Sequence, residues 1–594
     1  MNRTSRLGLL VLLVAAFCSV GAFAYGQGAT TQTLSGSVTD ASGAVIPGAD
    51  VAAKHTGTGI VTNAVTNAEG LFSMPSLPIG TYTVTVTLQG FKTSIIQNVV
   101  VTSASPANVK AALEVGGVSE QVTVSSSSEI VQTQSSTVAQ TINTTQITKL
   151  PLTSRSAMDF VNFLPGVTTA NGNRQASING LPRGTINITL DGVNVQDNTL
   201  RTTDGFFAIV SPRLDAIEEV TVSTAAQGAG DAGQGAAQVR FVTKSGSNSF
   251  TGSGYYYQRR DKLNANTWFN NRNAVPKVKL KQDQAGFAAG GPIVLPGFDG
   301  HNKAFFFVNY EEFHQPSAVT RNNRTVLNTA AQTGAFCYPG NCVNVLQLAA
   351  ANGQTSTVDP TVGKLLGDIR SAVTGGSLSD IDPNLQRFAF NVPVQSVRRY
   401  PTFRLDYNLS QKHRASFAYN YQKFTDFPDT LNSREASFPG FPVEAGQSSI
   451  RLGWAGAVRS TLSRNLVNEA RVGYSGAPVV FFGELNPGMY TGTVANQQGF
   501  QLNFPTVGSA LTNPSAGAAP QSRNANSELI EDTLNWLKGS HSISMGGSFT
   551  QYDIWAKNSS LLPTINFGLT SNDPANSLFT AANFPGAAAA QLTA

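Results

Sequence analysis

The second half of the chain, from Asn248 onward, alternates apolar and polar residues over long stretches. Examples are FRLDYNL (403–409), ASFAYNYQ (415–422) and ISMGGSFT (543–550). Because the side chains of a β-strand point alternately to its two faces, each stretch predicts a strand with one apolar face. Lengths near ten residues, with Tyr, Phe and Trp frequent at the ends, are typical of transmembrane barrel strands. A soluble β-sandwich alternates in the same way, so the connections must decide between the two.

The connections between these strands fall into two classes. Short polar turns recur as LSQKH (409–413), LSRNL (462–466) and LKGSH (537–541). The other connections are long and irregular, at 313–400 and 476–526. Short turns at one end and long loops at the other favour an antiparallel transmembrane β-barrel, which we assign to residues 248–594.

Residues 30–115 predict a smaller, separate β-unit. The stretch YTVTVTL (82–88) alternates, and turn residues recur at short intervals on either side of it. Such spacing predicts a small β-sandwich. Residues 116–135 are rich in Ser and Gly and are typical of a linker. The β-prone patch EQVTV (120–124) inside this linker is either a strand that ends the sandwich or a strand offered to a partner by β-augmentation.

Residues 136–247 predict an α+β unit of short strands and small helices. An apolar face within TSRSAMDFVNFL (153–164) predicts a short helix that ends at Pro165-Gly166. The stretch SINGLPRGTINITLDG (177–192) predicts strands at 177–181 and 185–190, with Pro-Arg-Gly between them. Two further strands are expected before residue 247, joined by a Gly/Ala-rich loop.

Asp191-Gly192, which closes the second of these strands, is either a turn or a carboxylate presented for chemistry. Asp-Gly suits a turn that requires a positive φ at glycine. A catalytic aspartate would need a base, a nucleophile or a metal nearby, and the stretch contains no His or Cys. We therefore predict a structural turn.

Residues 1–24 have the pattern of an export signal, with early arginines, an apolar run from Leu7 to Phe17 and the sequence AFA at 22–24. A membrane anchor is the alternative, but the run is short for a span. A lipoprotein modified at Cys18 is a second alternative, which the bulky Phe17 disfavours. In an oxidising compartment, Cys337 and Cys342 of CYPGNC are expected to form a loop disulfide.

The first unit resembles the carboxypeptidase regulatory-like family, on the phrases GSVTDASGAVIPGADV (36–51), TNAEGLF (66–72) and LPIGTYTV (77–84). A zinc peptidase needs His and Glu ligands that converge on one metal. None of the five histidines begins an H-x-x-E or H-E-x-x-H pattern. The unit is therefore expected to be an accessory module, with no enzyme activity, metal or cofactor.

The order of units as a whole resembles the TonB-dependent outer-membrane receptors, specifically the Oar-like group. The resemblance rests on INGLPRGTINITLDGVNVQDN (178–198), VRFVTKSGSNSFTGSGYYYQR (239–259) and KAFFFVNYEEF (303–313), which stand in the family's order. It implies a mainly β chain in which the α+β unit is a plug that fills the lumen of the barrel.

The resemblance also implies functional residues and partners. The plug motif comprises Asn179, Gly180, Leu190, Asp191 and Gly192. The candidate TonB box, the strand gripped by a TonB-type energy-transducing protein, comprises Glu120, Val122, Thr123 and Val124. The expected location is the outer membrane and its lipid, with the N-terminal unit in the periplasm. A scarce small ligand or carbohydrate would move inward using energy delivered through TonB.

One feature departs from the family. Plugged barrels of this type have about 22 strands, whereas residues 250–555 offer about ten candidates of suitable length. We therefore expect a fragment or a truncated product. Trp268, Trp454 and Trp536 are expected in the interfacial belt, with sugar stacking as the alternative.

Other function classes are weighed against the receptor. A surface adhesin or structural outer-membrane protein stays open. An exported hydrolase is disfavoured because no G-x-S-x-G pattern occurs. The net charge of +5 is spread along the chain without a Lys/Arg block, which excludes nucleic acid as a partner.

Overall fold

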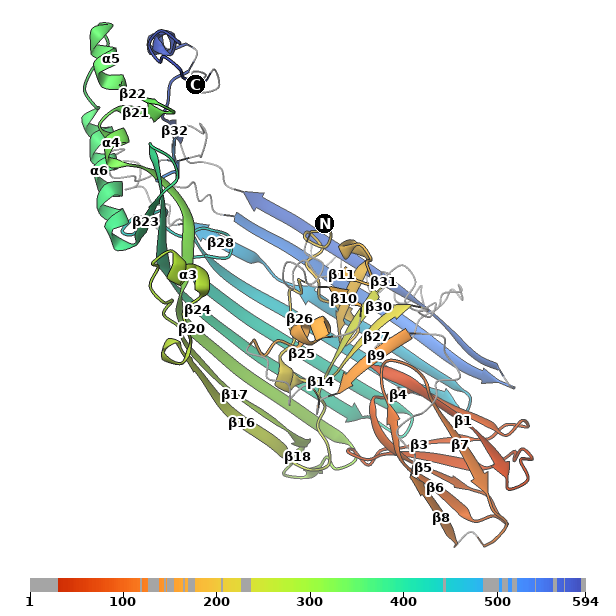
Figure 1. Cartoon of the computed structure of the whole chain (residues 1–594). Helices are drawn as coiled ribbons and strands as arrows, with labels where there is room; N and C mark the ends of the chain where they lie inside the picture. The colour runs from red at the N-terminus through yellow and green to blue at the C-terminus, as the bar shows by residue number, and fades with distance from the viewer. Residues whose placement is uncertain are drawn as a thin grey trace, which may run out of the picture.

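The computed structural model places three units along the chain (Figure 1). A β-sandwich lies at one end of a large sheet, and an α+β unit lies against one face of that sheet, here called the inner face. The structure describes residues 30–117, 120–125, 138–143, 146, 154–163, 166–168, 177–203, 207–225, 237–441, 445–483, 501–504, 511–514, 521–539, 541–558, 564–570 and 572–588. The predicted signal at 1–24, the Pro165 helix stop and most of the Gly/Ala-rich loop lie outside the described residues.

The sandwich consists of two sheets that enclose one apolar core. Leu34, Phe72 and Val84 are among its most buried side chains, because every second residue of each strand faces inward. The three-stranded sheet has the order β4 (Leu71–Pro78), β1 (Thr31–Asp40), β7 (Ala107–Leu113). The five-stranded sheet has the order β3 (Val61–Val65), β2 (Asp50–His55), β5 (Gly80–Thr87), β6 (Thr93–Val101), β8 (Gln121–Ser125).

The position of β8 agrees with one of the two alternatives given for EQVTV (120–124), a strand that ends the sandwich. β8 pairs in parallel with β6, from Thr93 opposite Gln121 to Gln97 opposite Ser125. The sandwich therefore extends through Ser125, past the boundary predicted at 115. The sequence left the partner of this strand open, because the pairing partner lies about 28 residues earlier in the chain.

The α+β unit is built on a five-stranded sheet with its own core. Phe160, Ile188, Val220 and Phe241 are buried in one cluster. The sheet has the order β13 (Val193–Asn194), β12 (Ile186–Leu190), β15 (Ala237–Thr243), β14 (Ile217–Ala225), β9 (Val138–Asn143). The remaining elements are η1 (Ala157–Phe163), β10 (Val167–Thr168), β11 (Ser177–Ile178), η3 (Arg183–Thr185) and η4 (Leu214–Ala216).

The strand predicted at 177–181 is shorter than expected. β11 ends at Ile178, because Asn179 and Gly180 have φ values of 50° and 72° and turn the chain. The amide of Leu181 donates to the carbonyl of Ile178 across this turn (2.9 Å). The prediction placed the strand end at Leu181 because this residue is apolar. The Asn179-Gly180 pair was the sequence signal for the turn that ends the strand earlier.

The large sheet is antiparallel and has eleven strands. Along its main path the order is β16 (Thr251–Arg260), β17 (Lys281–Pro292), β20 (Ala304–Leu327), β24 (Leu385–Asn408), β25 (His413–Phe427), β26 (Ala445–Ser463), β27 (Leu466–Gly476), β30 (Gln521–Lys538), β28 (Val479–Gly483). β31 (His541–Asn558) pairs with β30, and β23 (Ser377–Asp380) pairs with β24. The three predicted short connections join adjacent strands, at the end of the sheet near the sandwich (Figure 1).

Strand lengths correct one prediction. β20 and β24 have 24 residues each, so the connection between them runs from 328 to 384 and not from 313 to 400. At about 3.3 Å per residue, such strands span far more than an apolar band about 25 Å tall. Their outer halves carry an arm of helices, at the end of the sheet opposite the sandwich (Figure 1).

Helix α6 anchors this outer arm. Asp359 caps it by accepting hydrogen bonds from the amides of Thr361 (2.8 Å) and Val362 (3.1 Å). Its residues Leu365 and Ile369 are buried among apolar side chains of the outer strands. The arm contains α4 (Thr329–Gln332), β21 (Ala335–Tyr338), β22 (Asn341–Asn344), α5 (Val345–Ala351), α6 (Pro360–Ala372) and η7 (Val373–Gly375). Other short elements are η6 (Asp261–Leu263), α3 (Trp268–Arg272), β18 (Val294–Leu295), β19 (Phe298–Asp299), β29 (Gln501–Asn503), β32 (Thr564–Asn566) and η10 (Pro574–Leu578).

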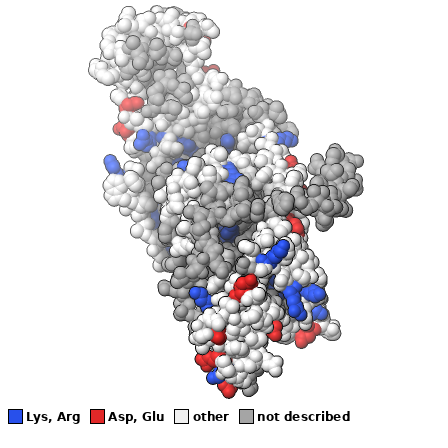
Figure 2. Space-filling view, turned by 90° about the vertical axis from the view of Figure 1, so that its right-hand side faces the viewer, with Lys and Arg blue, Asp and Glu red and all other residues white. Residues whose placement is uncertain are grey.

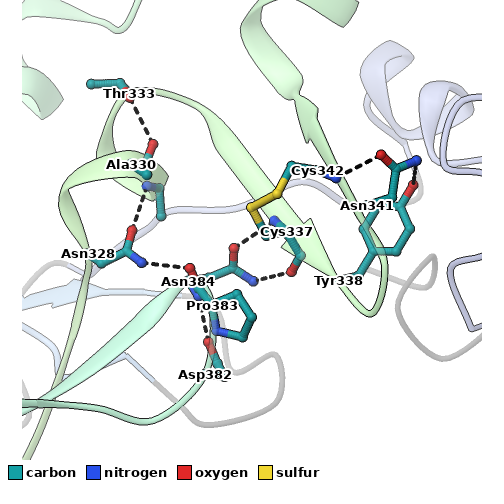
Figure 3. Close-up of a disulfide and its surroundings, with 11 residues drawn as sticks. Asn328, Ala330, Thr333, Cys337, Tyr338, Asn341, Cys342, Asp382, Pro383 and Asn384 are labelled. Atoms are coloured by element: carbon teal, nitrogen blue, oxygen red, sulfur yellow. Dashed lines mark hydrogen bonds between the residues drawn. A yellow bond between two sulfur atoms is a disulfide. The ribbon is translucent and has the colours of Figure 1, made fainter.

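A disulfide closes the β21–β22 hairpin of the arm (Figure 3). Cys337 and Cys342 face each other in register across the turn at Pro339-Gly340, where Gly340 has a φ of 85°. Asn384 holds the hairpin to the base of the arm, since its amide bonds both the N–H and the carbonyl of Cys337 (2.7 Å each). Among the described residues, no helix is long and apolar enough to cross a membrane.

Candidate functional site

The contact between the α+β unit and the large sheet centres on Glu311 of β20. This carboxylate is 0% exposed, although it lies in a strand whose other face is open. Arg213 of the α+β unit donates to it from Nε (2.6 Å), and the hydroxyl of Tyr255 donates at 2.5 Å. Nε of Arg155 lies 3.6 Å away, and Arg155 also pairs with Asp215. One buried and one half-buried cation of the α+β unit thus surround one buried anion of the large sheet.

The Asp191-Gly192 turn makes a second contact with the inner face. Both residues have positive φ values, 51° and 88°, and they form the two-residue loop between β12 and β13. The side chain of Asp191 is buried and accepts hydrogen bonds from the amide (2.9 Å) and hydroxyl (2.6 Å) of Thr243. A Cβ at Gly192 would lie 2.5 Å from Nη1 of Arg471, so the turn fits closely against β27.

Val193, the next residue, occupies a small apolar seat on the large sheet. It packs with Ala455 and Leu529, and all three are buried. A Cβ at Gly473 would overlap Cγ2 of Val193, so the absence of a side chain at Gly473 makes room for the hairpin.

Further polar contacts tie the two units together. Arg404 donates to the carbonyl of Thr243 (2.6 Å), and Gln422 donates to the carbonyl of Ser211 (2.6 Å). Nη2 of Arg523 lies 3.1 Å from a carboxylate oxygen of Asp197. Hydrogen bonds and ion pairs fix the relative position of the two units. Water can take the place of each lost partner if the units separate.

The sandwich also contacts the large sheet. Arg459 of the large sheet donates to the carbonyl of Pro75 (3.0 Å), and Asn67 donates to the carbonyl of Gly539 in a short turn (2.9 Å). A cavity of about 410 Å³ remains where the three units meet. Its lining includes Gly80 of the sandwich, Glu218 of the α+β unit and Arg414 of the large sheet.

Comparison with known families matches all three units. Residues 33–114 match a carboxypeptidase regulatory-like domain, residues 131–238 a TonB-dependent receptor plug domain, and residues 242–591 an outer membrane beta barrel domain. The last match alone covers more than half of the chain. The chain belongs to the TonB-dependent receptors. The predicted fold class is therefore confirmed: the α+β unit is the plug and the large sheet belongs to the barrel wall.

Three of the solved structures that match part of the chain are a transporter and two receptors. The outer membrane transporter YddB from Escherichia coli is 11% identical, with 70% of this chain and 48% of that chain covered and a TM-score of 0.46. The siderophore receptor PirA from Acinetobacter baumannii is 13% identical, with coverages of 70% and 48% and a TM-score of 0.42. The ferric enterobactin receptor from Pseudomonas aeruginosa is 12% identical, with coverages of 70% and 49% and a TM-score of 0.41. The chain spans about half the length of each. No curated protein matches the sequence.

The residues of the predicted plug motif fall in two places in the receptor. The Asp191-Gly192 turn lies at the barrel wall, as described above, and Leu190 directly before it is buried in the core of the plug. Asn179 and Gly180 form an exposed turn elsewhere on the plug, which the amide of Asn179 fixes by donating to the carbonyl of Gly166 (2.7 Å). The motif is therefore two turns of the same kind rather than one site.

Val122, Thr123 and Val124 of the candidate TonB box lie on β8, and Glu120 directly precedes it. Within the described part of the chain, β8 is an edge strand of the sandwich sheet. The amide of Thr93 donates to the carbonyl of Glu120 (2.8 Å). This hydrogen bond shows which residues of the parallel pair point their backbone groups toward β6. In a parallel pair alternate residues of a strand point their N–H and C=O groups to the same side. Val122 and Val124 therefore direct their backbone groups toward β6, whereas Thr123 directs its own outward.

The contacts that seat the plug were not predicted from the sequence. Glu311, Arg213 and Gly473 take part in them, and none of the three was singled out. One signal was present: Glu311 follows Phe305, Phe307 and Asn309 at alternate positions, so the period of two already placed a carboxylate on the buried face.

Acidic, basic and metal-ligating side chains are dispersed over the parts of the chain considered next. Among the described residues, no group of three or more His, Cys, Asp or Glu side chains is placed to hold a metal ion. On the face shown in Figure 2, Lys/Arg and Asp/Glu side chains stand in small groups of both signs, with no large area of one sign.

Glu219 links the plug to the sandwich and predicts a pH dependence. It is buried in β14 and accepts a hydrogen bond from the amide of Ser103 (2.7 Å). Burial raises the pKa of the Glu219 carboxyl above its ordinary value. The docked state therefore binds a proton more tightly than the separated state. Docking is expected to be strongest below the ordinary pKa and to weaken as the pH rises through the raised pKa.

Hydrogen exchange of the Ser103 amide, corrected for the intrinsic effect of pH, measures this dependence. Protection should fall with rising pH in the wild type, and Glu219→Gln should remove the fall while keeping an acceptor oxygen. The same pH profile in Glu219→Gln would mean that another group controls docking.

Proposed function

We propose that this receptor takes up a scarce solute across the outer membrane, coupled to a TonB-type energy-transducing protein in the periplasm. The observation that carries the proposal is that β8 is an edge strand, among the strands described, of a unit that touches both the plug and the wall. Short turns of outer-membrane barrels face the periplasm. The sandwich contacts that end of the wall, which supports its placement in the periplasm.

The connectivity gives a route from β8 to the plug. β9, the first described strand after β8, is the edge strand of the plug sheet and pairs only with β14. Tension applied at β8 would reach the N-terminal end of β9 through the intervening chain. An edge strand can be detached from one neighbour without breaking the rest of the sheet, so it is the first part of the plug to yield. Displacement of the plug then opens a path, and no bond of the solute has to change.

Replacing Thr123 with proline tests the coupling. The substitution removes an N–H that points outward, so the β6–β8 ladder stays intact while a partner strand loses a hydrogen bond. Proline also prevents regular pairing along that edge. Photocrosslinking from position 121 to a TonB-type protein in the native cell is expected to fall about tenfold or more, the effect of losing about 1.4 kcal/mol or more.

The controls separate pairing from folding. Thr123→Ala keeps the N–H and should crosslink like the wild type, whereas Val122→Pro should break the ladder with β6 and loosen the sandwich itself. Wild-type crosslinking by Thr123→Pro, with an intact sandwich, would exclude β8 as the TonB box. Absence of any crosslink from positions 120, 121 and 123 in the wild type would favour the adhesin alternative.

A further inference from the structure

The barrel wall carries a buried arginine that forms no ion pair with an acidic side chain of the described residues. Arg451 of β26 faces the lumen and is 4% exposed. Its guanidinium lies over the ring of Phe424 on β25 (4.2 Å to the centroid) and near the ring of Phe207 of the plug (5.3 Å). Arg398 of β24 lies over the same Phe424 ring, also at 4.2 Å. We call Arg398, Arg451, Phe424, Phe207 and Asp426 the lumen cluster.

The charges around Arg451 do not balance. The nearby described carboxylates are Asp426 and Asp197. Asp426 pairs with Arg398 (3.5 Å), and Asp197 pairs with Arg523 (3.1 Å). Three guanidinium groups therefore face two carboxylates, and Nε of Arg451 has no hydrogen-bond partner among the described residues. A buried cation without an anion or full hydrogen bonding is costly, and such groups are retained mainly for function.

The surroundings of Arg451 define what would satisfy it. Aromatic rings approach the flat faces of its guanidinium, through Phe424 and Phe207. The N–H groups point out from the edge of the guanidinium plane, and this edge binds an oxyanion with two parallel hydrogen bonds. A neutral sugar hydroxyl would leave the charge uncompensated, whereas a carboxylate would neutralise it.

A second unsatisfied atom adds to this description. Oδ1 of Asp426 is buried and has no hydrogen-bond partner among the described residues. Asp426 and Phe424 lie two residues apart on the same face of β25, so the two side chains are adjacent along the strand. A carboxylate oxygen accepts hydrogen bonds only, so its partner must be a donor such as a hydroxyl.

From these two groups we infer that the lumen cluster binds a hydroxylated carboxylic acid, of the sugar-acid class. The carboxylate of the ligand lies against the N–H edge of Arg451, with Arg398 adding positive charge, and a ligand hydroxyl donates to Asp426. This inference rests on the proposed uptake function and names the class of solute that the receptor takes up.

The experiment is a calorimetric titration of the purified full chain in detergent with two matched probes, D-glucuronate and D-glucose. Glucuronate is expected to bind, and glucose to bind at least about tenfold more weakly, since only glucuronate offers a carboxylate. Arg451→Gln should weaken glucuronate binding by about tenfold or more. Lys423→Gln makes the same change of charge on the outer face of β25 and should leave binding unchanged.

A thermal midpoint distinguishes lost binding from lost folding. Without ligand, Arg451→Gln should keep or raise the midpoint, because it removes an unpaired buried charge. Should that variant melt earlier, Arg398→Gln takes its place, since the Arg398 side chain is 33% exposed. Equal binding of both probes, no binding of glucuronate, or wild-type affinity in Arg451→Gln and Arg398→Gln would each overturn the inference. The Thr123→Pro crosslinking result tests the proposed function independently.

Discussion

Replacing Glu311 with alanine is expected to weaken the seating of the plug on the barrel wall by about 3–5 kcal/mol. Glu311 is the acceptor for Arg213 and Tyr255 and lies close to Arg155. Its removal leaves Arg213 buried, with only the carbonyl of Ser154 as a described hydrogen-bond acceptor (2.9 Å). Breaking one partner of a buried pair costs far more than the pair contributes, because the remaining charge stays out of water.

Hydrogen exchange of the plug strands β12, β14 and β15 measures this loss, since exchange through separation of the plug from the wall should become faster. Glu312→Ala is the matched control. Glu312 is the next residue, points to the other face and makes an exposed pair with Arg399 (3.3 Å). Glu312→Ala should change the free energy of plug separation, as measured by exchange, by less than about 1 kcal/mol. Equal effects of the two substitutions would mean that the cluster around Glu311 does not hold the plug.

Replacing Gly473 with alanine is expected to push the plug hairpin off its seat, at a cost of about 1–3 kcal/mol. The new Cβ would overlap Cγ2 of Val193, and the backbone carbonyl of Trp454 (3.2 Å) limits movement the other way. Gly473 has an ordinary strand conformation, so the effect comes from packing and not from backbone strain.

A compensating substitution makes this prediction specific. In a Val193→Ala background the overlapping methyl is gone. The cost of Gly473→Ala should then be smaller than in the wild type by at least about 0.5 kcal/mol, a coupling of the size seen between residues in contact. Gly456→Ala is the control, because its Cβ would meet no atom closer than 3.8 Å. Exchange of the β12–β13 hairpin is measured in the wild type, the two single variants, the double variant and the control. Additive effects of the Val193 and Gly473 changes would show that the two residues do not share a seat.

Both predictions concern a plug that is held mainly by polar groups. Arg404, Gln422 and Arg523 of the wall each bond a backbone carbonyl or a carboxylate of the plug. The apolar core of the plug is internal and does not extend far into the wall. The plug is therefore a separate folded body, whose contacts with the wall can be exchanged for water.

Much of the fold could be predicted, because it depends on patterns among residues that are close in the sequence. Alternation identified the strands of the wall, and the three short turns gave their antiparallel order. The Asp191-Gly192 turn followed from the residues alone, since the conformation with two positive φ values is a local property. The extent of the strands did not follow, because β20 and β24 continue beyond the stretch of regular alternation and are held there by α6.

The sequence by itself determined the three units, their order, and which residues of each strand share a face. Only the tertiary structure decided which faces meet: that Glu311 lies opposite Arg213, that Gly473 makes room for Val193, and that β8 pairs with β6. The physical reason is range. A period of two or a turn pair depends on neighbours within a few residues, whereas each of these contacts joins positions about 30 to 280 residues apart, and such contacts exist only once the chain has folded.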